Sequence, residues 1–305
     1  MSDALTAVQL FMFLAVDTWQ NLCAAHELKI SYGEETITNS CLLEMKRARL
    51  RTVVVRQFTK HEEASWGADW EWWIRVTRGG WVRYAVQAKK IAVPTARYPT
   101  LRHKVKDSKC PGYQIDRLDW FANACRPRAV PAYCFYNYVD IHNLKARDVS
   151  LLQHRLRSAP LLGLCPPAQH HPERLLGCTV AHLEFVKTFH ARGRPKDFLS
   201  IHLPALYQGD VLPWHELLLG LPRSLVAPGP GQPDQPYIVP AIPRAIADFA
   251  LGRTDRVPLE LYPRGGPDGP ASGAAEAADV FLPKRLAILE MSNLEEKLNV
   301  GDRNQ

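Results

Sequence analysis

The segment GADWEWWIRVTRGGWVRYAVQAKKI, residues 67–91, contains two runs of aromatic and β-branched residues on either side of the sequence TRGG. Such runs are typical of β-strands, and a pair of glycines between them favours a hairpin. Three charged side chains, Asp69, Glu71 and Lys89, lie among the tryptophans. Because a charge beside apolar surface costs free energy unless it is paired, these side chains are predicted to have partners.

The length of the turn decides which residues of the hairpin face one another. If residues 78–80 form a three-residue loop, Asp69 lies opposite Lys89. Glu71 then lies opposite Gln87. Side chains alternate between the two faces of a strand, so this register places all four on one face of the hairpin. A two-residue loop at the glycines would shift the pairing by one residue and separate them.

The elements around the hairpin follow the order helix, strand, strand, strand, helix, strand from about residue 33 to residue 138. Apolar residues at helical spacing predict helices, and short runs rich in β-branched or aromatic residues predict strands. We predict helices over residues 4–28, 31–49 and 113–125, and strands over 51–58, 68–76, 81–91 and 129–139. The predicted fold class is α/β, with a mixed sheet flanked by helices.

The second predicted helix begins with a capping-box pattern, Ser31 followed three residues later by Glu34. In a capping box, the glutamate side chain reaches back to the backbone of the cap residue. Glu34 is therefore predicted to serve the helix end, which leaves Glu35 for another role.

Residues 146–305 have a less regular pattern than residues 1–145, which we predict to be the core with its N-terminal helix. The second half is predicted to contain helices at 147–159, 174–190 and 240–251, a strand at 280–289, and Pro- and Gly-rich loops at 222–240 and 262–275. We expect a helical, loop-rich and Pro/Gly-rich C-terminal extension, which either stands apart or packs on the same core.

Positive charge is concentrated in one part of the chain. Residues 46–109 contain sixteen lysines and arginines against five acidic residues, a surplus of eleven. The whole chain carries +7, so the remainder carries −4. A basic segment of this kind indicates a polyanionic partner, of which nucleic acid is the usual one. The alternative is a basic face that is solvated and has no ligand.

The cysteine content and the N-terminal segment bear on the compartment. Seven cysteines without regular spacing, in a chain with no secretory leader, predict reduced thiols and a cytoplasmic protein. The apolar run at residues 4–16 is too short to span a bilayer and no basic region precedes it, so we predict a buried helix and no membrane partner. A homo-oligomer is compatible with the sequence.

Five residues resemble a known catalytic motif. Glu35 near the start of a helix, Asp69 at the head of a strand, and Gln87-Ala88-Lys89 on the next strand resemble the PD-(D/E)XK superfamily of restriction-endonuclease-like nucleases. EETIT, GADWEWW and QAKK are similar to an uncharacterised bacterial branch of it, whose members suggest a role in anti-phage defence. The resemblance covers about residues 31–138 and implies a restriction-endonuclease-like fold and endonuclease activity on DNA.

The resemblance also implies roles for individual residues. Asp69 is expected to be the principal ligand of Mg²⁺ or Mn²⁺, with Glu35 and the backbone carbonyl of Ala88 completing the set. Lys89 is expected to orient the attacking water or to stabilise charge on the phosphorus. A divalent cation suits phosphodiester hydrolysis because it neutralises phosphate charge and generates hydroxide near neutral pH. Mg²⁺ prefers oxygen ligands and keeps several waters, so one or two carboxylates suffice.

Gln87 departs from the superfamily pattern, which has Asp or Glu at this position. Its amide oxygen can coordinate a hard cation but brings no negative charge. Glu71 can restore the missing charge if it lies on the same face. Alternatively, Gln87 marks a catalytically inactive module that binds nucleic acid on the same fold.

The basic loop after the hairpin is the predicted nucleic-acid interface. It is rich in proline and lysine, which suits an exposed loop over a binding surface. Contacts to the DNA backbone are expected from Arg97, Arg102, Lys104, Lys106 and Lys109.

A rival constellation for metal binding lies in the second half of the chain, at Cys165, His170, His171, Cys178 and His182. These residue types bind zinc, and a zinc-stabilised interaction protein is a third hypothesis. Their spacing does not match the usual paired motifs, and helix packing with surface histidines is the alternative interpretation. The tryptophans of the hairpin are interpreted as core residues.

Overall fold

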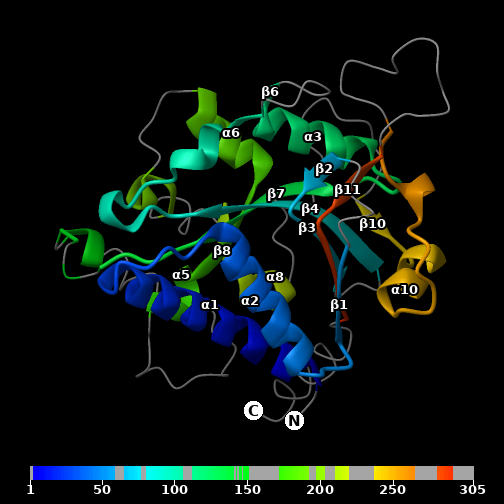
Figure 1. Cartoon of the computed structure of the whole chain (residues 1–305), viewed down its shortest axis with the longest axis horizontal. Coiled ribbons are helices and arrows are strands. Elements are labelled where there is room, and N and C mark those ends of the chain that lie inside the picture. The colour runs from blue at the N-terminus through cyan, green and yellow to red at the C-terminus, as the bar shows by residue number, and fades with distance from the viewer. Residues whose placement is uncertain are drawn as a thin grey trace, which may run out of the picture.

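The computed structural model describes residues 3–58, 65–76, 80–105, 112–140, 142, 144–145, 147–150, 172–191, 197–202, 210–219, 237–264 and 280–290. Its centre is an eight-stranded mixed sheet with helices on both faces (Figure 1). Seven strands follow one another across it in the order β1 (Val53–Gln57), β12 (Arg285–Leu289), β3 (Trp70–Val76), β4 (Gly80–Lys90), β7 (Val130–Tyr136), β8 (Cys178–His182) and β9 (Val211–Pro213), while β10 (Ile238–Val239) pairs with β4. The predicted α/β class with a mixed sheet flanked by helices is confirmed.

The central hairpin forms, but the predicted register is wrong by two residues. Val76 pairs with Gly80 and Glu71 pairs with Ala85, so the connection consists of residues 77–79, which lie outside the described residues. Gly80 is the first residue of β4, and β10 pairs with β4 beside it, so that a Cβ on Gly80 would lie 2.3 Å from Cγ2 of Ile238. Because the observed register differs from the predicted one by an even number of residues, each side chain still points to the predicted face of the hairpin.

One face of the sheet is covered by α1 (Asp3–Glu27), α2 (Glu34–Arg47), α5 (Pro172–Leu176) and α8 (Trp214–Leu219) (Figure 1). The indole of Trp214 donates a 3.1 Å hydrogen bond to Sγ of Cys134 on β7. Trp70 and Trp72 of β3 are buried on this face, as predicted, and Trp72 packs edge-on against Trp214. Within the described residues, no helix is both long and apolar enough to cross a membrane.

The opposite face is covered by α3 (Gln114–Ala124) and α6 (Leu183–Ala191) (Figure 1). Side chains at odd positions of β3 and β4 point to this side. Trp73 is fully buried there, which agrees with its prediction as a core residue. The predicted helices at 4–28, 31–49 and 113–125 correspond to α1, α2 and α3.

Strands from the second half of the chain complete the sheet. β8 and β9 extend it beyond β7, and β12 lies between β1 and β3. The predicted helix at 174–190 is wrong, because β8 separates α5 from α6. Gly177 allows this change of direction: a Cβ there would lie 1.9 Å from the carbonyl oxygen of Ala15 on α1. The following residues then pair with β7, and this pairing overrides their helical spacing.

The other predictions for the second half are confirmed where they can be followed. The short helix is α10 (Arg244–Ala250), and the late strand is divided at Lys284 into β11 (Phe281–Pro283) and β12. Residues 147–150 are helical, and the rest of the predicted helix lies outside the described residues. Most of the two Pro- and Gly-rich segments also lies outside them.

A buried polar network fastens the segment that follows β4. The hydroxyl of Tyr98 donates to the side-chain carbonyl of Asn137, at the end of β7. The Asn137 amide donates to the carbonyl of Leu176, 2.7 Å away. His202 is fully buried beside them, with Nε2 2.8 Å from Oγ1 of Thr179. Burial lowers the pKa of His202 to about 3, so the ring is neutral at physiological pH.

We expect His202→Gln to lower the free energy of unfolding at pH 7 by about 1–2 kcal/mol, because a buried hydrogen-bonded ring is replaced. The difference from the wild type should shrink on acidification. Unfolded histidine takes up a proton near pH 6.5 and folded His202 only near pH 3, so the wild type loses stability between these values. One histidine can change the free energy of unfolding by at most about 1.4 kcal/mol per pH unit. Urea unfolding at several pH values measures it, and a pH-independent difference would contradict a buried neutral ring.

Candidate functional site

Two strand bends lie side by side at the edge of the region where β3 and β4 pair. Asp69 separates β2 (Ser65–Ala68) from β3, and Lys284 separates β11 from β12. β11 pairs in parallel with β2, and β12 pairs in parallel with β3. The backbone N–H of Lys284 donates to the carbonyl of Ala68 at 3.1 Å. The two bends therefore occur at the same level and place both side chains in one location.

The carboxylate of Asp69 is held from both sides. Oδ2 accepts hydrogen bonds from the side-chain amide of Gln87 and, at 3.0 Å, from the backbone N–H of Ala88. Oδ1 lies 3.3 Å from the ammonium of Lys284. In a strand, the N–H and C=O of one residue leave on the same side, so the Ala88 carbonyl is also directed to this edge.

Glu34 is the glutamate that faces the site. The N-cap of α2 is Gly33, and no side chain caps the helix, so the predicted capping box with Ser31 is wrong. Instead, Oε2 of Glu34 accepts from the backbone N–H of Lys90 at 3.1 Å. Burial raises the pKa of Glu34, the charge of Lys89 opposes this, and the charge of Asp69 adds to it. Glu34 is thus within electrostatic range of both predicted site residues.

Glu35, the glutamate predicted for this role, points outward. Its side chain is 71% exposed, and Oε1 accepts from Nζ of Lys284 at 3.0 Å. The same ammonium contacts Asp69, so Glu35 borders the site through Lys284. Helical geometry explains the difference, because consecutive residues point about 100° apart and only one of them can face the sheet.

Lys89 lies inside the site. It is 3% exposed and shares the odd-numbered face of β4 with Gln87, next to Asp69. Its positive charge favours the ionised form of Glu34. The structure therefore brings together Asp69, Gln87, Ala88 and Lys89, as the sequence predicts, although Asp69 faces Gln87 and not Lys89.

Glu71 is engaged elsewhere on the same face. Its oxygens accept from the guanidinium of Arg83 at 2.8 Å and from the indole of Trp73 at 2.6 Å. Both members of the ion pair are 1% exposed. Arg83 also donates to three backbone carbonyls, among them that of Leu261 at 3.3 Å. Glu71 is therefore not brought to the site, and the charge missing at Gln87 is not supplied by it.

We expect Glu71→Gln to lower the free energy of unfolding by about 3–5 kcal/mol, because it leaves Arg83 buried without a counter-charge. The affinity for Mn²⁺ should be unchanged. Glu290→Gln is the matched control, since its pair with Arg75 is about one-third exposed and should cost less than about 1 kcal/mol. Urea unfolding and calorimetric titration measure the two effects. A variant of normal stability that no longer binds Mn²⁺ would show that Glu71 is a ligand.

Besides Glu34, two residues at the site were not predicted. The sequence around Lys284 does not indicate a site residue, because its position beside Asp69 depends on the insertion of β12 between β1 and β3. Tyr133 is the neighbour of Gln87 across the β4–β7 pair. Its hydroxyl is buried and, among the described residues, has no hydrogen-bond partner. Burial raises the pKa of Tyr133, and the nearby charges of Asp69, Asp116 and Glu34 raise it further.

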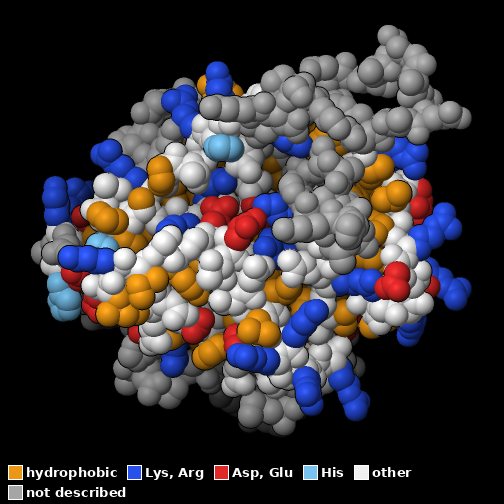
Figure 2. All heavy atoms as spheres, viewed as in Figure 1, with side chains coloured by type: hydrophobic (Ala, Val, Ile, Leu, Met, Phe, Trp, Pro, Cys, Tyr) orange, Lys and Arg blue, Asp and Glu red, His pale blue; other side chains and the backbone are white. Residues whose placement is uncertain are grey.

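Basic residues of the predicted interface lie on the surface after β4. Arg97, Arg102 and Lys104 are exposed, on or between η2 (Val93–Thr95), η3 (Pro99–Arg102) and β5 (Lys104–Val105). Lys106 and Lys109 lie outside the described residues. Figure 2 shows a small group of acidic side chains near the N-terminal end of α2, bordered by lysine and arginine side chains.

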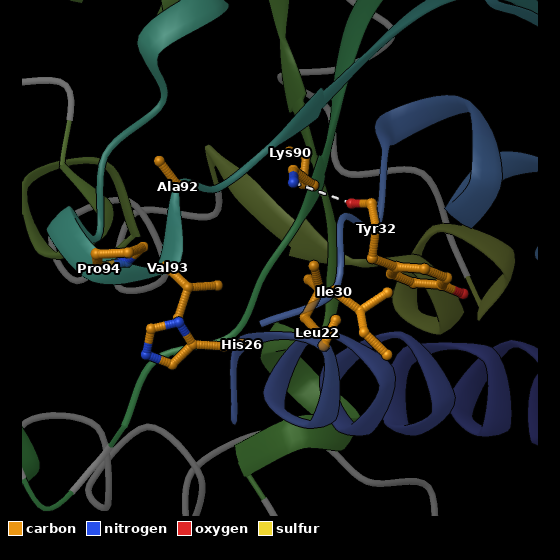
Figure 3. Close-up of a pocket in the computed structure, with 9 residues that line it drawn as sticks. Leu22, His26, Ile30, Tyr32, Lys90, Ala92, Val93 and Pro94 are labelled. Atoms are coloured by element: carbon orange, nitrogen blue, oxygen red, sulfur yellow. Dashed lines mark hydrogen bonds between the residues drawn. The ribbon is translucent and has the colours of Figure 1, made fainter. Parts of the chain in front are cut away.

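A pocket of about 270 Å³ adjoins the site at the end of β4 (Figure 3). Its walls are mainly apolar, and His26, Tyr32 and Lys90 are its polar members. Lys90 donates to the carbonyl of Tyr32 at 2.9 Å, and its backbone is the partner of Glu34. The pocket and the site are therefore joined through one residue.

Within the described residues, no group of three or more His, Cys, Asp and Glu side chains is arranged to hold a metal ion. Two members of the rival zinc constellation are engaged separately. Cys178 donates to Oγ1 of Thr18 at 3.3 Å, and Nδ1 of His182 accepts from the backbone of Glu184 at 3.1 Å. Cys165, His170 and His171 lie outside the described residues.

The fold and the site define an α/β protein with carboxylates and ammonium groups gathered at one edge of its central hairpin. A family model described as "Family of unknown function (DUF6615)" matches residues 7–250, and the chain belongs to this family. The matched range includes Glu34, Asp69 and Lys89 but ends before Lys284. No curated protein matches the chain, and no solved structure matches it.

Proposed function

We propose that this chain is a metal-dependent nuclease that hydrolyses DNA phosphodiester bonds, on a restriction-endonuclease-like fold and in the setting of anti-phage defence. One observation carries the proposal. The buried carboxylate of Asp69, the half-buried carboxylate of Glu34 and the buried ammonium of Lys89 converge where β3 and β4 separate. This grouping matches the resemblance in the sequence, with Glu34 in the place first assigned to Glu35.

The donors at the site suit a hard divalent cation. Carboxylate oxygens of Asp69 and Glu34, the amide oxygen of Gln87 and the carbonyl of Ala88 are the ligand types that Mg²⁺ and Mn²⁺ prefer. The buried hydroxyl of Tyr133 supports the presence of a further polar group in the complete site. When bound, the cation would act as a Lewis acid and lower the pKa of a bound water.

The protein residues have separate tasks in this proposal. Asp69 and Glu34 hold the cation, and the hydrogen bond from Ala88 keeps the Asp69 carboxylate in place. Lys89 stabilises negative charge that develops on the phosphate, and its burial strengthens this interaction because water screens it less. Arg97, Arg102 and Lys104 contact the phosphate backbone, which makes binding salt-dependent and largely independent of sequence.

The adjoining pocket supports a nucleotide substrate. At about 270 Å³ it is smaller than the roughly 300–1,000 Å³ of a drug-sized ligand site, so it suits a fragment such as one nucleobase. Apolar walls can contact the face of a base, while Lys90 and His26 offer polar contacts.

A second candidate function is a nucleic-acid-binding module that does not cut. Gln87 provides no negative charge, and its amide already donates to Asp69. The described residues also lack a group of three acidic, histidine or cysteine ligands. Both functions predict DNA binding that weakens with salt, and only the nuclease predicts a product that chelator prevents.

We expect the protein to cleave plasmid or single-stranded DNA with Mg²⁺ or Mn²⁺ and not with EDTA. Lys89→Met and Asp69→Asn should lower kcat by at least about 100- to 1,000-fold, because charge on the transition state loses its stabilisation. Lys89→Met should still bind DNA. Lys187→Met is the control, since Lys187 pairs with Asp119 and Glu184 outside the site. Salt-sensitive binding without cleavage of either DNA form would favour the non-cutting module.

The two adjacent glutamates provide a second test of the site. We expect Glu34→Gln to abolish cleavage and to weaken Mn²⁺ binding, and Glu35→Gln to retain most of both. In the metal-free protein, Glu34→Gln should melt at an equal or higher temperature than the wild type, because ionised Glu34 is disfavoured by burial. Gel assays, calorimetry and thermal melting measure these outcomes. If Glu35→Gln instead loses cleavage and Mn²⁺ binding while Glu34→Gln keeps both, Glu35 is the metal ligand.

A further inference from the structure

Lys284 is delivered to the site by a fixed backbone. Its N–H donates to the carbonyl of Ala68, and its carbonyl accepts from the N–H of Phe58, each at 3.1 Å. β11 and β12 extend the chain on either side of it and are both paired in the sheets. The Lys284 side chain is 25% exposed, so its stem is packed while the ammonium group can still reach solvent.

The ammonium of Lys284 lies on the side of Asp69 that a cation would need. Oδ2 of Asp69 is occupied by the amide of Gln87 and the N–H of Ala88, which are fixed by β4. The remaining oxygen, Oδ1, lies 3.3 Å from Lys284 Nζ. The same ammonium is 3.0 Å from Oε1 of Glu35. Lys284 thus holds together two carboxylates that would otherwise repel each other.

We propose that Lys284 is a built-in counter-ion of this site, which neutralises Asp69 and Glu35 in the metal-free protein and is displaced from Asp69 when a divalent cation binds. Identifying the site as a cation site rests on the proposed function. Lys284 and the cation compete for Oδ1, so the measured cation affinity is lower than the carboxylates alone would give. In return, the metal-free site avoids an uncompensated cluster of negative charge.

The test is calorimetric titration of the full chain with Mn²⁺, without DNA. We expect Lys284→Met to bind Mn²⁺ at least about fivefold more tightly than the wild type, the lower end of typical coupling between sites. Its metal-free melting temperature should fall, and the increase in melting temperature on adding Mn²⁺ should be larger. Lys284→Arg keeps the charge and should stay near the wild-type affinity.

Lys187 offers a matched control outside the site. Its ammonium also bridges two carboxylates, 2.5 Å from Asp119 and 2.7 Å from Glu184, and its side chain is 32% exposed. Lys187→Met should leave Mn²⁺ affinity unchanged. If Lys284→Met does not fold, Lys284→Gln removes the charge with a polar side chain and is expected to show the same tighter binding.

The outcomes separate this proposal from the proposed function. Unchanged or weaker Mn²⁺ binding by the neutral Lys284 variants, with a wild type that binds Mn²⁺ and cuts DNA, overturns the counter-ion role alone. Tighter binding by these variants in a protein that never cuts DNA supports the counter-ion role and counts against the nuclease. If neither the wild type nor the variants bind Mn²⁺, both proposals fail.

Discussion

The hydrogen bond from the backbone N–H of Ala88 to the carboxylate of Asp69 is the constraint on which the site depends. The pairing of β3 with β4 ends at Trp70. Beyond it, the backbone N–H of Ala88 on β4 donates to the side chain of Asp69 and not to a backbone carbonyl of β3. A carboxylate used in this way cannot turn away from the sheet. Gln87 and Lys89, which flank Ala88, are therefore held beside it, and the bend at Asp69 opens the edge where Glu34 and Lys284 enter.

The charged side chains of the hairpin form two separate groups, one in the core and one at the site. Glu71 and Arg83 form a closed pair, fully buried and surrounded by carbonyl and indole partners, which belongs to the core. At the site, Glu34 and Asp69 lie near Lys89, and Lys284 joins Asp69 to the outward-facing Glu35, where solvent reaches the cluster. The closed pair leaves no charge uncompensated, whereas the cluster at the site remains partly open to solvent, which is the difference on which the proposed cation site rests.

Much of the fold follows from local pattern. Periodicity and turn residues predicted α1, α2, β1, β3, β4, α3 and β7, because each of them has an amphipathic or β-branched signal of its own. The short strands β2 and β5 were not predicted. The hairpin register missed by two residues, since Gly80 serves the close approach of Ile238 instead of the turn. The segment 174–190 was predicted as one helix, since a short apolar run does not reveal that a sheet edge will pair with it.

The sequence by itself determined that Gln87 and Lys89 share one face of their strand, because side chains alternate along a strand. It placed Asp69 on the same face through the prediction of a three-residue turn, and the turn has that length. Only the tertiary structure decided which glutamate turns inward, since that depends on how α2 packs against the end of β4, where the backbone N–H of Lys90 donates to Glu34. The same holds for Lys284. It lies 215 residues from Asp69 in the chain, and only the insertion of β12 between β1 and β3 brings its charge to that carboxylate.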